Sequence, residues 1–259
     1  HSSDNKTRDA RTVTVHLTTA ETESLLRDVP SVYHTQINDV LLSALLVVFN
    51  EWTGKDQLYL ELEGHGREEL ERNVDITRTV GWFTTIFPVL LEKTSSDLGG
   101  LLPSVKEQLR QIPDNGIGYG LLRYLSQDES VRSALASPPR AQISFNYLGQ
   151  SDQLQSDNAA FTMSQDEIAS GQSDQGTRLH VLEVVGLVTK GKLKLDWIYS
   201  DRIHKQETIT KLANAYVNAL RGFIDHCLRP DAGGYTPSDF SKVELNDQEL
   251  DDIMDDLDI

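Results

Sequence analysis

The sequence predicts an α/β protein in which helices cover a mixed β-sheet. Two patterns indicate this class. Strand-like segments alternate apolar and polar residues, and helix-like segments repeat apolar residues every three or four positions. The strands and helices follow one another without the regular short units of a dinucleotide-binding domain, so we expect an α/β sandwich.

The predicted elements follow in chain order. Strands are expected at 12–17, 57–64, 83–92 and 141–149, and as the two arms of a hairpin at 179–200 that turns at Lys190-Gly191. Helices are expected from Thr18 to just before Pro30, from Thr35 to Gly54, over 101–111 and over 207–227. In the second strand the leucines share one face, which leaves Tyr59, Glu61 and Glu63 on the other.

Composition narrows the class of protein. The 259 residues include 40 acidic and 24 basic side chains, a formal charge of −16, which argues against nucleic-acid binding. The longest apolar stretch, 41–49, is too short to span a membrane. The single cysteine, Cys227, excludes an intramolecular disulfide and suits a reducing compartment, so we expect a cytoplasmic protein. A Gly-, Pro- and Ser-rich stretch at 231–240 separates a predicted body, 1–230, from a tail, 231–259.

The common catalytic fingerprints are missing from the sequence. It contains no G-x-S-x-G, H-E-x-x-H, C-x-x-C or G-x-G-x-x-G, and its histidines show no ligand spacing, so we expect no metal site. A phosphate-loop-like run ending in Gly191-Lys192 has Leu193 where Ser or Thr would bind magnesium, and it lies in the predicted hairpin.

Four polar and glycine-rich clusters remain. They are EGHGRE at 63–68, RTVGWFT at 78–84, PDNGIGYG at 113–120 and FNYLGQ at 145–150. A carboxylate at a strand end, flanked by glycines, suits proton transfer if the site partly desolvates it. Each cluster by itself also fits an ordinary structural role: a polar turn, a strand entry, a helix-ending loop, or polar residues that satisfy nearby backbone groups.

In this order, the four clusters resemble signature motifs of the epimerization domains of nonribosomal peptide synthetases. The segments INDVLLSAL at 37–45 and 197–213 are similar to the same family's C-terminal half. The resemblance implies a chloramphenicol-acetyltransferase-like fold of two lobes with a tunnel between them. The family's HHxxxD motif lies in the N-terminal lobe and does not occur here, so we expect this chain to be the C-terminal lobe, one lobe of the two-lobed domain.

The resemblance also implies a reaction. Epimerization domains invert the α-carbon of an aminoacyl or peptidyl thioester that a carrier protein holds on its phosphopantetheine arm, so this chain needs no cofactor of its own. Glu63 matches the family's catalytic carboxylate, and Tyr147 matches a candidate proton donor or enolate stabiliser. We assign supporting roles to Arg78, Asn146 and His65: Arg78 orients Glu63, Asn146 holds the loop, and His65 shapes the turn.

The implied partners are a peptidyl carrier protein and the N-terminal lobe bearing HHxxxD, which supplies the second acid/base. The chain alone is therefore expected to be inactive. Two alternatives stay open. The chain could be a lobe of a condensation domain, although that leaves EGHGRE and FNYLGQ without a reason. It could also be a non-catalytic module that docks a carrier protein or partner synthetase.

The acidic tail generates a separate prediction. Leu250, Ile253, Met254 and Leu257 form one apolar stripe on an otherwise acidic helix, similar to docking helices at the ends of synthetase subunits. We expect deletion of residues 245–259 to leave the body folded but to impair product transfer to the downstream synthetase. Leu250→Asp combined with Leu257→Asp should do the same in a transfer assay between separate polypeptides, and unchanged transfer would exclude docking. Affinity should weaken with salt, because the tail is acidic.

Overall fold

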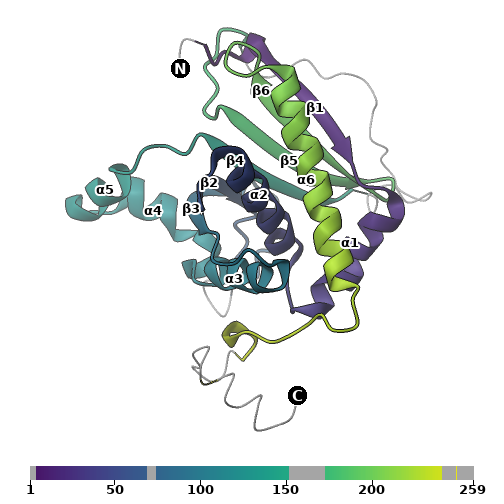
Figure 1. Ribbon diagram of the computed structural model, residues 1–259. Coiled ribbons are helices and arrows are strands. Elements are labelled where there is room, and N and C mark those ends of the chain that lie inside the picture. Colours follow the sequence, from purple (N-terminus) through teal and green to yellow (C-terminus); the bar gives the residue numbers. More distant parts are fainter. Residues whose placement is uncertain (1–3, 69–73, 152–172, 241–248, 250–259) are drawn as a thin grey trace. The chain divides into compact units, whose positions relative to one another are not determined.

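The computed structural model describes residues 4–68, 74–151, 173–240 and Glu249 (Figure 1). The strands are β1 (Ala10–His16), β2 (Gln57–Gly64), β3 (Thr85–Glu92), β4 (Ile143–Gln150), β5 (Leu182–Thr189) and β6 (Lys192–Ser200). The helices are α1 (Thr19–Val32), α2 (Ile37–Thr53), α3 (Leu98–Arg110), α4 (Gly118–Leu125), α5 (Glu129–Ala136) and α6 (Gln206–Cys227). Short 3₁₀ turns are η1 (Thr7–Asp9), η2 (Pro113–Gly116) and η4 (Pro237–Asp239). The α/β class with a mixed sheet is confirmed.

The chain divides into two compact units. The first, here called the sheet unit, comprises residues 1–22, 59–90 and 113–217. The second, the helical unit, comprises residues 23–58, 91–112 and 218–259. Each unit is described by itself below.

The strand order is β1-β6-β5-β4-β2-β3. The strand pairs β1/β6 and β5/β6 are antiparallel, whereas β2/β4 and β4/β5 are parallel. The predicted hairpin turn is confirmed, because Lys190 and Gly191 both have positive φ values, 51° and 70°, as a tight type I′ turn requires. Buried and exposed side chains alternate along β5 and β6, so the sheet has one apolar and one polar face.

The core of the sheet unit lies against the apolar face of this sheet. Buried side chains come from alternate positions of β5 and β6 and from the part of α6 that belongs to this unit. Trp197 on β6 meets Tyr216 on α6 edge to face, with ring centroids 5.6 Å apart. Both rings are fully buried, so this aromatic contact joins helix to sheet within the unit.

The helical unit contains α2, α3 and the end of α6, with α3 packed on α2. Arg110 on α3 donates to both carboxylate oxygens of Asp39 at 3.1 and 2.7 Å, and Asp39 also accepts the backbone N–H of Gln36, which starts α2. Helix α1 continues through Pro30 to Val32 instead of ending before the proline. Leu25 and Val29 are fully buried, and this burial outweighs the hydrogen bond that proline costs near the helix end.

The C-terminal end of α6 holds the single cysteine of the chain. Cys227 is 4% exposed, and burial raises the pKa of its thiol to about 11. The thiol is therefore protonated and shielded at neutral pH.

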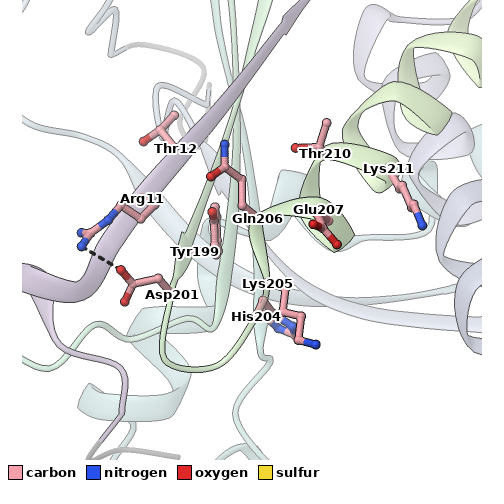
Figure 2. A pocket seen from close by; sticks show the side chains of 10 residues that line it. All are labelled: Arg11, Thr12, Tyr199, Asp201, His204, Lys205, Gln206, Glu207, Thr210 and Lys211. Atoms are coloured by element: carbon pink, nitrogen blue, oxygen red, sulfur yellow. Dashed lines mark ion pairs between the residues drawn. The ribbon is translucent and has the colours of Figure 1, made fainter.

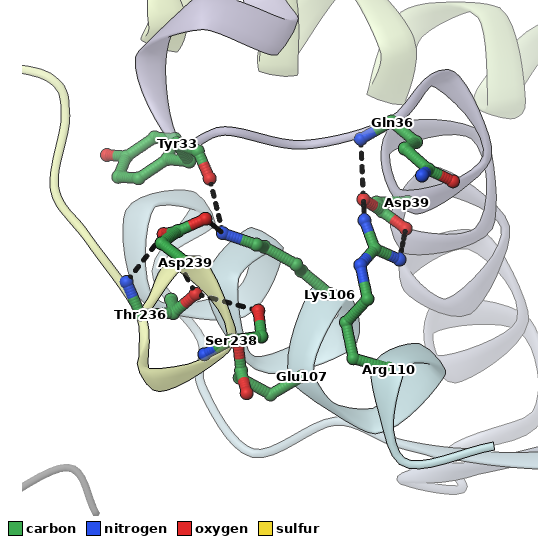
Figure 3. A network of polar contacts seen from close by, with 9 residues as sticks. All are labelled: Tyr33, Gln36, Asp39, Lys106, Glu107, Arg110, Thr236, Ser238 and Asp239. Atoms are coloured by element: carbon green, nitrogen blue, oxygen red, sulfur yellow. Dashed lines mark hydrogen bonds and ion pairs between the residues drawn. The ribbon is translucent and has the colours of Figure 1, made fainter. Parts of the chain in front are cut away.

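Residues 231–240, predicted as a linker, are fixed within the helical unit. The Nζ of Lys106 on α3 donates to Asp239 at 2.6 Å and to the carbonyl of Tyr33 at 2.9 Å (Figure 3). Thr236 donates its backbone N–H to the same Asp239 side chain, and Tyr235 stacks on His34. The glycines and proline suggested flexibility, but the buried Lys106 needs a counter-charge and Asp239 supplies it. The predicted docking helix, 245–259, lies outside the described residues except for Glu249.

No single helix within the described ranges has the length and hydropathy needed to cross a membrane. The consecutive helices α1 and α2 reach that level only as a pair, with a bend of 101° between them.

The buried ion pair yields a stability prediction. Lys106→Met should lower the free energy of unfolding by about 3 kcal/mol at neutral pH, because Asp239 loses its counter-charge. Burial raises the pKa of Asp239, but the hydrogen bonds from Lys106 and from the Thr236 backbone, with the charges of Lys106 and His34, together outweigh it, and the net pKa is lowered. The pair therefore contributes fully above the ordinary aspartate pKa of about 3.9, and this contribution is lost as the pH falls through the lowered value.

Urea denaturation at pH 7 and at pH 3 measures the difference in the free energy of unfolding between wild type and Lys106→Met. We expect this difference to be smaller at pH 3 than at pH 7. The exposed Lys55, in the same unit, provides a matched control, and Lys55→Met should change stability by less than about 0.5 kcal/mol. Equal effects of the two substitutions would show that the ion pair does not stabilise the unit.

Candidate functional site

Three of the four motifs meet around the end of β2, in the sheet unit. Arg67 lies 4.3 Å from the ring centroid of Phe83 and donates to the carbonyl of Ile76 at 2.6 Å. Asn115 donates to Glu68 at 2.9 Å. The EGHGRE segment is therefore tied to both RTVGWFT and PDNGIGYG.

The PDNGIGYG turn approaches β3 closely enough to exclude a side chain. Asp114, Asn115 and Gly116 all have positive φ values, 45°, 50° and 79°. A Cβ at Gly116 would overlap the ring of Phe87 on β3. Only glycine fits here, because the backbone is left-handed and the space is already filled.

The fourth motif reaches the site through parallel pairing of β2 with β4. Glu61 lies opposite Ser144 and Leu62 opposite Phe145, so Glu63 and Asn146 fall next to each other on the polar face. Asn146 Nδ2 donates to Glu63 Oε2 at 2.6 Å. The sequence prediction gave Asn146 the role of holding the loop, whereas this contact lets it orient the Glu63 carboxylate directly.

The surroundings make Glu63 a stronger base than a free carboxylate. Burial by nearby protein atoms raises the pKa of Glu63, and the carboxylate of Glu183 adds to this. His180 and the hydrogen bond from Asn146 act in the opposite direction, but the net pKa is raised. Glu63 nevertheless keeps an accessible surface, so a substrate could reach its carboxylate.

Tyr147, the second predicted catalytic residue, lies on the other face of the sheet. It pairs with Gly186 on β5, and its ring covers the side-chain position of that glycine beside the buried Leu195. Burial raises the pKa of Tyr147. Because successive residues of a strand point to opposite faces, Asn146 and Tyr147 cannot both face Glu63. The structure therefore brings Asn146, and not Tyr147, to the predicted carboxylate.

The other two supporting residues lie at the edge of the site. The side chain of Arg78 is exposed and has no hydrogen bond or ion pair with a described residue, so the contact expected between Arg78 and Glu63 is not present. His65 accepts the backbone N–H of Arg67 at 2.9 Å and lies 3.4 Å from Glu68. His65 thus closes the turn between Arg67 and Glu68.

Sequence reasoning missed two acid–base pairs next to Glu63, each with one side chain less than 10% exposed. His180 Nε2 lies 2.7 Å from Glu61 Oε2, and Arg178 donates to Glu183 at 2.8 and 3.2 Å. The alternation along β2 had placed Glu61 on the polar face, but no motif marked His180 or Arg178.

A cavity of about 890 Å³ lies elsewhere in the sheet unit, between β1, β6 and the start of α6. Figure 2 shows its lining side chains, including Arg11 paired with Asp201 at 2.7 Å. These side chains carry mixed charge and spread over three elements without converging on one point, and none belongs to the four motifs. The motif cluster at β2 is therefore the better candidate site. Across the described residues no group of three or more His, Cys, Asp or Glu could hold a metal ion.

Comparison with known proteins identifies the family. A family model for the condensation domain matches residues 1–246. The chain belongs to the condensation-domain family. Within the family, it is 50% identical over 242 residues to a linear gramicidin synthase of Brevibacillus parabrevis, covering 92% of this chain and 5% of that synthase polypeptide. It is 40% identical to gramicidin S synthase 1 of Brevibacillus brevis, covering 97% of this chain and 24% of the relative.

Solved structures of related synthetase domains also resemble this chain. The epimerization domain from the third module of tyrocidine synthetase B superimposes with a TM-score of 0.80 at 37% identity, over 88% of this chain and 50% of that one. The condensation domain of the monacolin K polyketide synthase shares the fold, with a TM-score of 0.61 at 14% identity, over 90% of this chain and 50% of that one. This condensation-domain chain therefore spans half the length of the structures it resembles and a small part of its curated relatives.

The close approach at Gly116 yields a prediction. Gly116→Ala should destabilise the chain by about 2–5 kcal/mol, because it combines a left-handed alanine with overlap against Phe87. Gly118→Ala, two residues on at the start of α4, has no atom within 4 Å of the new Cβ and is a matched control. Thermal unfolding of the two variants compares them, and equal melting temperatures would refute the close packing.

Proposed function

We propose that this chain is the C-terminal lobe of an epimerization domain, which converts an L-aminoacyl or peptidyl thioester on a carrier protein to its D-epimer. The observation that carries the proposal is Glu63, an accessible carboxylate with a raised pKa, held by Asn146 at the point where the motifs meet. The likeness to the tyrocidine synthetase epimerization domain supports the same reaction class.

Inversion of the α-carbon requires a base that removes the α-proton. A thioester carbonyl acidifies the α-proton, and a carboxylate that is partly desolvated can remove it. The Glu63 carboxylate accepts the proton, and the electron pair of the broken C–H bond moves onto the thioester carbonyl as an enolate. A second group on the opposite face returns a proton to the α-carbon and inverts it. In this proposal the HHxxxD-bearing N-terminal lobe supplies that group, and the phosphopantetheine arm belongs to the carrier protein.

Exposed apolar side chains support a partner lobe for the sheet unit. Val80 is 100% exposed and Trp82 is 91% exposed, both in the RTVGWFT motif. Helix α4 adds exposed apolar residues: Leu121, Leu122, Tyr124 and Leu125. Large apolar groups in contact with water favour burial against another surface.

Two other functions compete with this one. A condensation-domain lobe would serve peptide-bond formation between two carrier-bound substrates, and a docking module would bind a carrier protein without chemistry. The raised pKa of Glu63 and its hydrogen bond from Asn146 favour proton transfer over both.

The test is exchange of the substrate α-proton in deuterated water, using an aminoacyl thioester on its carrier protein. We expect no exchange with the 259-residue chain alone and exchange when the HHxxxD-bearing N-terminal lobe is supplied. Glu63→Gln in the combined protein should reduce exchange by about 10²–10⁴-fold, the usual contribution of a positioned acid/base. Tyr147→Phe, on the opposite sheet face, should keep most of the activity and serves as the matched control.

Exchange at the full rate by Glu63→Gln would refute the role of this carboxylate. Peptide-bond formation without α-proton exchange would identify a condensation lobe instead. Carrier binding without either reaction would identify a docking module.

A further inference from the structure

Three carboxylates share the polar face of the sheet around the candidate site. Glu61 and Glu63 lie two residues apart on β2. Across the sheet, Ser144 on β4 pairs with both Glu61 and Glu183, so Glu183 on β5 lies on the same face, two strands from Glu61. Like charges gathered on one surface raise each other's proton affinity unless cations balance them.

The two outer carboxylates each have a basic partner. Glu61 bonds His180, and their side chains are 17% and 9% exposed. Glu183 accepts two hydrogen bonds from Arg178, whose side chain is 5% exposed. Asn5 anchors this segment, because its Nδ2 donates to the carbonyls of His180 at 2.8 Å and Arg178 at 3.2 Å.

Glu63, unlike Glu61 and Glu183, is not paired with a basic side chain among the described residues. Its hydrogen-bond partner is the neutral amide of Asn146, and no ion pair joins it to a described residue. A neutral donor orients a carboxylate without holding it in a salt bridge, so the carboxylate remains free to accept a proton.

We propose that His180 is a positioning residue for Glu63: with Arg178 it balances the two neighbouring carboxylates, so that Glu63 alone keeps a charge available for proton abstraction. This inference rests on the proposed function, since it concerns the same carboxylate. His180 acts through Glu61 and through its own charge, and its burial keeps it from touching a substrate.

Other titratable groups share this face. By register, β6 contributes Lys194 and Asp196, which pair with each other at 2.7 Å, and β1 contributes His16. Two further elements carry groups that interact with Glu61 or with one another. Tyr59 on β2 and Tyr119 on α4 influence each other electrostatically, and Arg123 on α4 interacts with Glu61 and Tyr59. None of these three contributes to the raised pKa of Glu63, whose charged neighbours are Glu183 and His180. A change at position 180 or 183 should therefore be felt directly at Glu63.

The experiment is a carbon-13 NMR titration of the full chain with labelled glutamate side chains. Glu63→Gln assigns the Glu63 carboxyl signal by its loss. In His180→Gln the titration midpoint of Glu63 should move to higher pH, because a positive charge that favours ionisation is removed. In Glu183→Gln the midpoint should move to lower pH, because a negative charge that opposes ionisation is removed.

His204→Gln is the matched control. His204 is a partly buried histidine of the same unit that lines the separate cavity between β1, β6 and α6, and its removal should leave the Glu63 midpoint unchanged. Shifts of opposite sign at positions 180 and 183, with no shift in His204→Gln, would support the charge balance, whereas shifts of one sign at both positions would indicate a structural disturbance.

An unchanged midpoint in folded His180→Gln would overturn the inference, even if Glu63→Gln abolishes exchange. If His180→Gln does not fold, the Glu183→Gln variant tests the inference, because the Glu183 side chain is 30% exposed and tolerates the change. An unchanged Glu63 midpoint in Glu183→Gln would also overturn the inference. In the combined two-lobed protein, His180→Gln should also shift the acidic limb of the exchange rate to higher pH. If the Glu63 midpoint shifts as expected but the two-lobed protein shows no α-proton exchange, the proposed function is refuted and the charge balance is still supported.

Discussion

The parallel pairing of β2 with β4 positions the central pair of the candidate site, Glu63 and Asn146. Parallel strands keep corresponding faces aligned, so the register that sets Leu62 beside Phe145 also sets Glu63 beside Asn146. A slip of one residue would exchange the two faces and bring Tyr147 to the carboxylate in place of Asn146. The apolar residues of both strands prevent this slip, because they would then face water. Burial of the core thus fixes which polar residue meets Glu63.

A cluster of acids is costly unless its charges are balanced, and this sheet face balances them unevenly. Salt bridges and charge-assisted hydrogen bonds hold a carboxylate in its ionised form, whereas desolvation and nearby acids favour its protonated form. Within the described residues, Glu61 and Glu183 each have a basic partner, whereas burial and the nearby Glu183 raise the pKa of Glu63. One sheet surface therefore holds carboxylates of the same chemistry in two different kinds of surroundings.

The sequence could predict the elements whose evidence is local. Alternation marked the strands, and Gly191 marked the hairpin turn, because glycine readily adopts a positive φ. It could not reveal contacts between distant segments. His180 reaches Glu61 across 119 positions, and Lys106 reaches Asp239 across 133. Helices α4 and α5 were not predicted. Each has 8 residues, too few for an apolar repeat to stand out, and α4 begins inside the glycine-rich PDNGIGYG cluster, which favoured a loop.

The buried Cys227 gives the chain a built-in reporter of local opening. It is the single thiol among 259 residues, and its raised pKa and low exposure make it unreactive while the end of α6 stays packed. A thiol reagent at neutral pH can modify it only during transient exposure, so the labelling rate measures how often that part of the helical unit opens. Because the thiol lies outside the sheet unit, this rate provides a readout of one unit's fluctuations that needs no introduced probe.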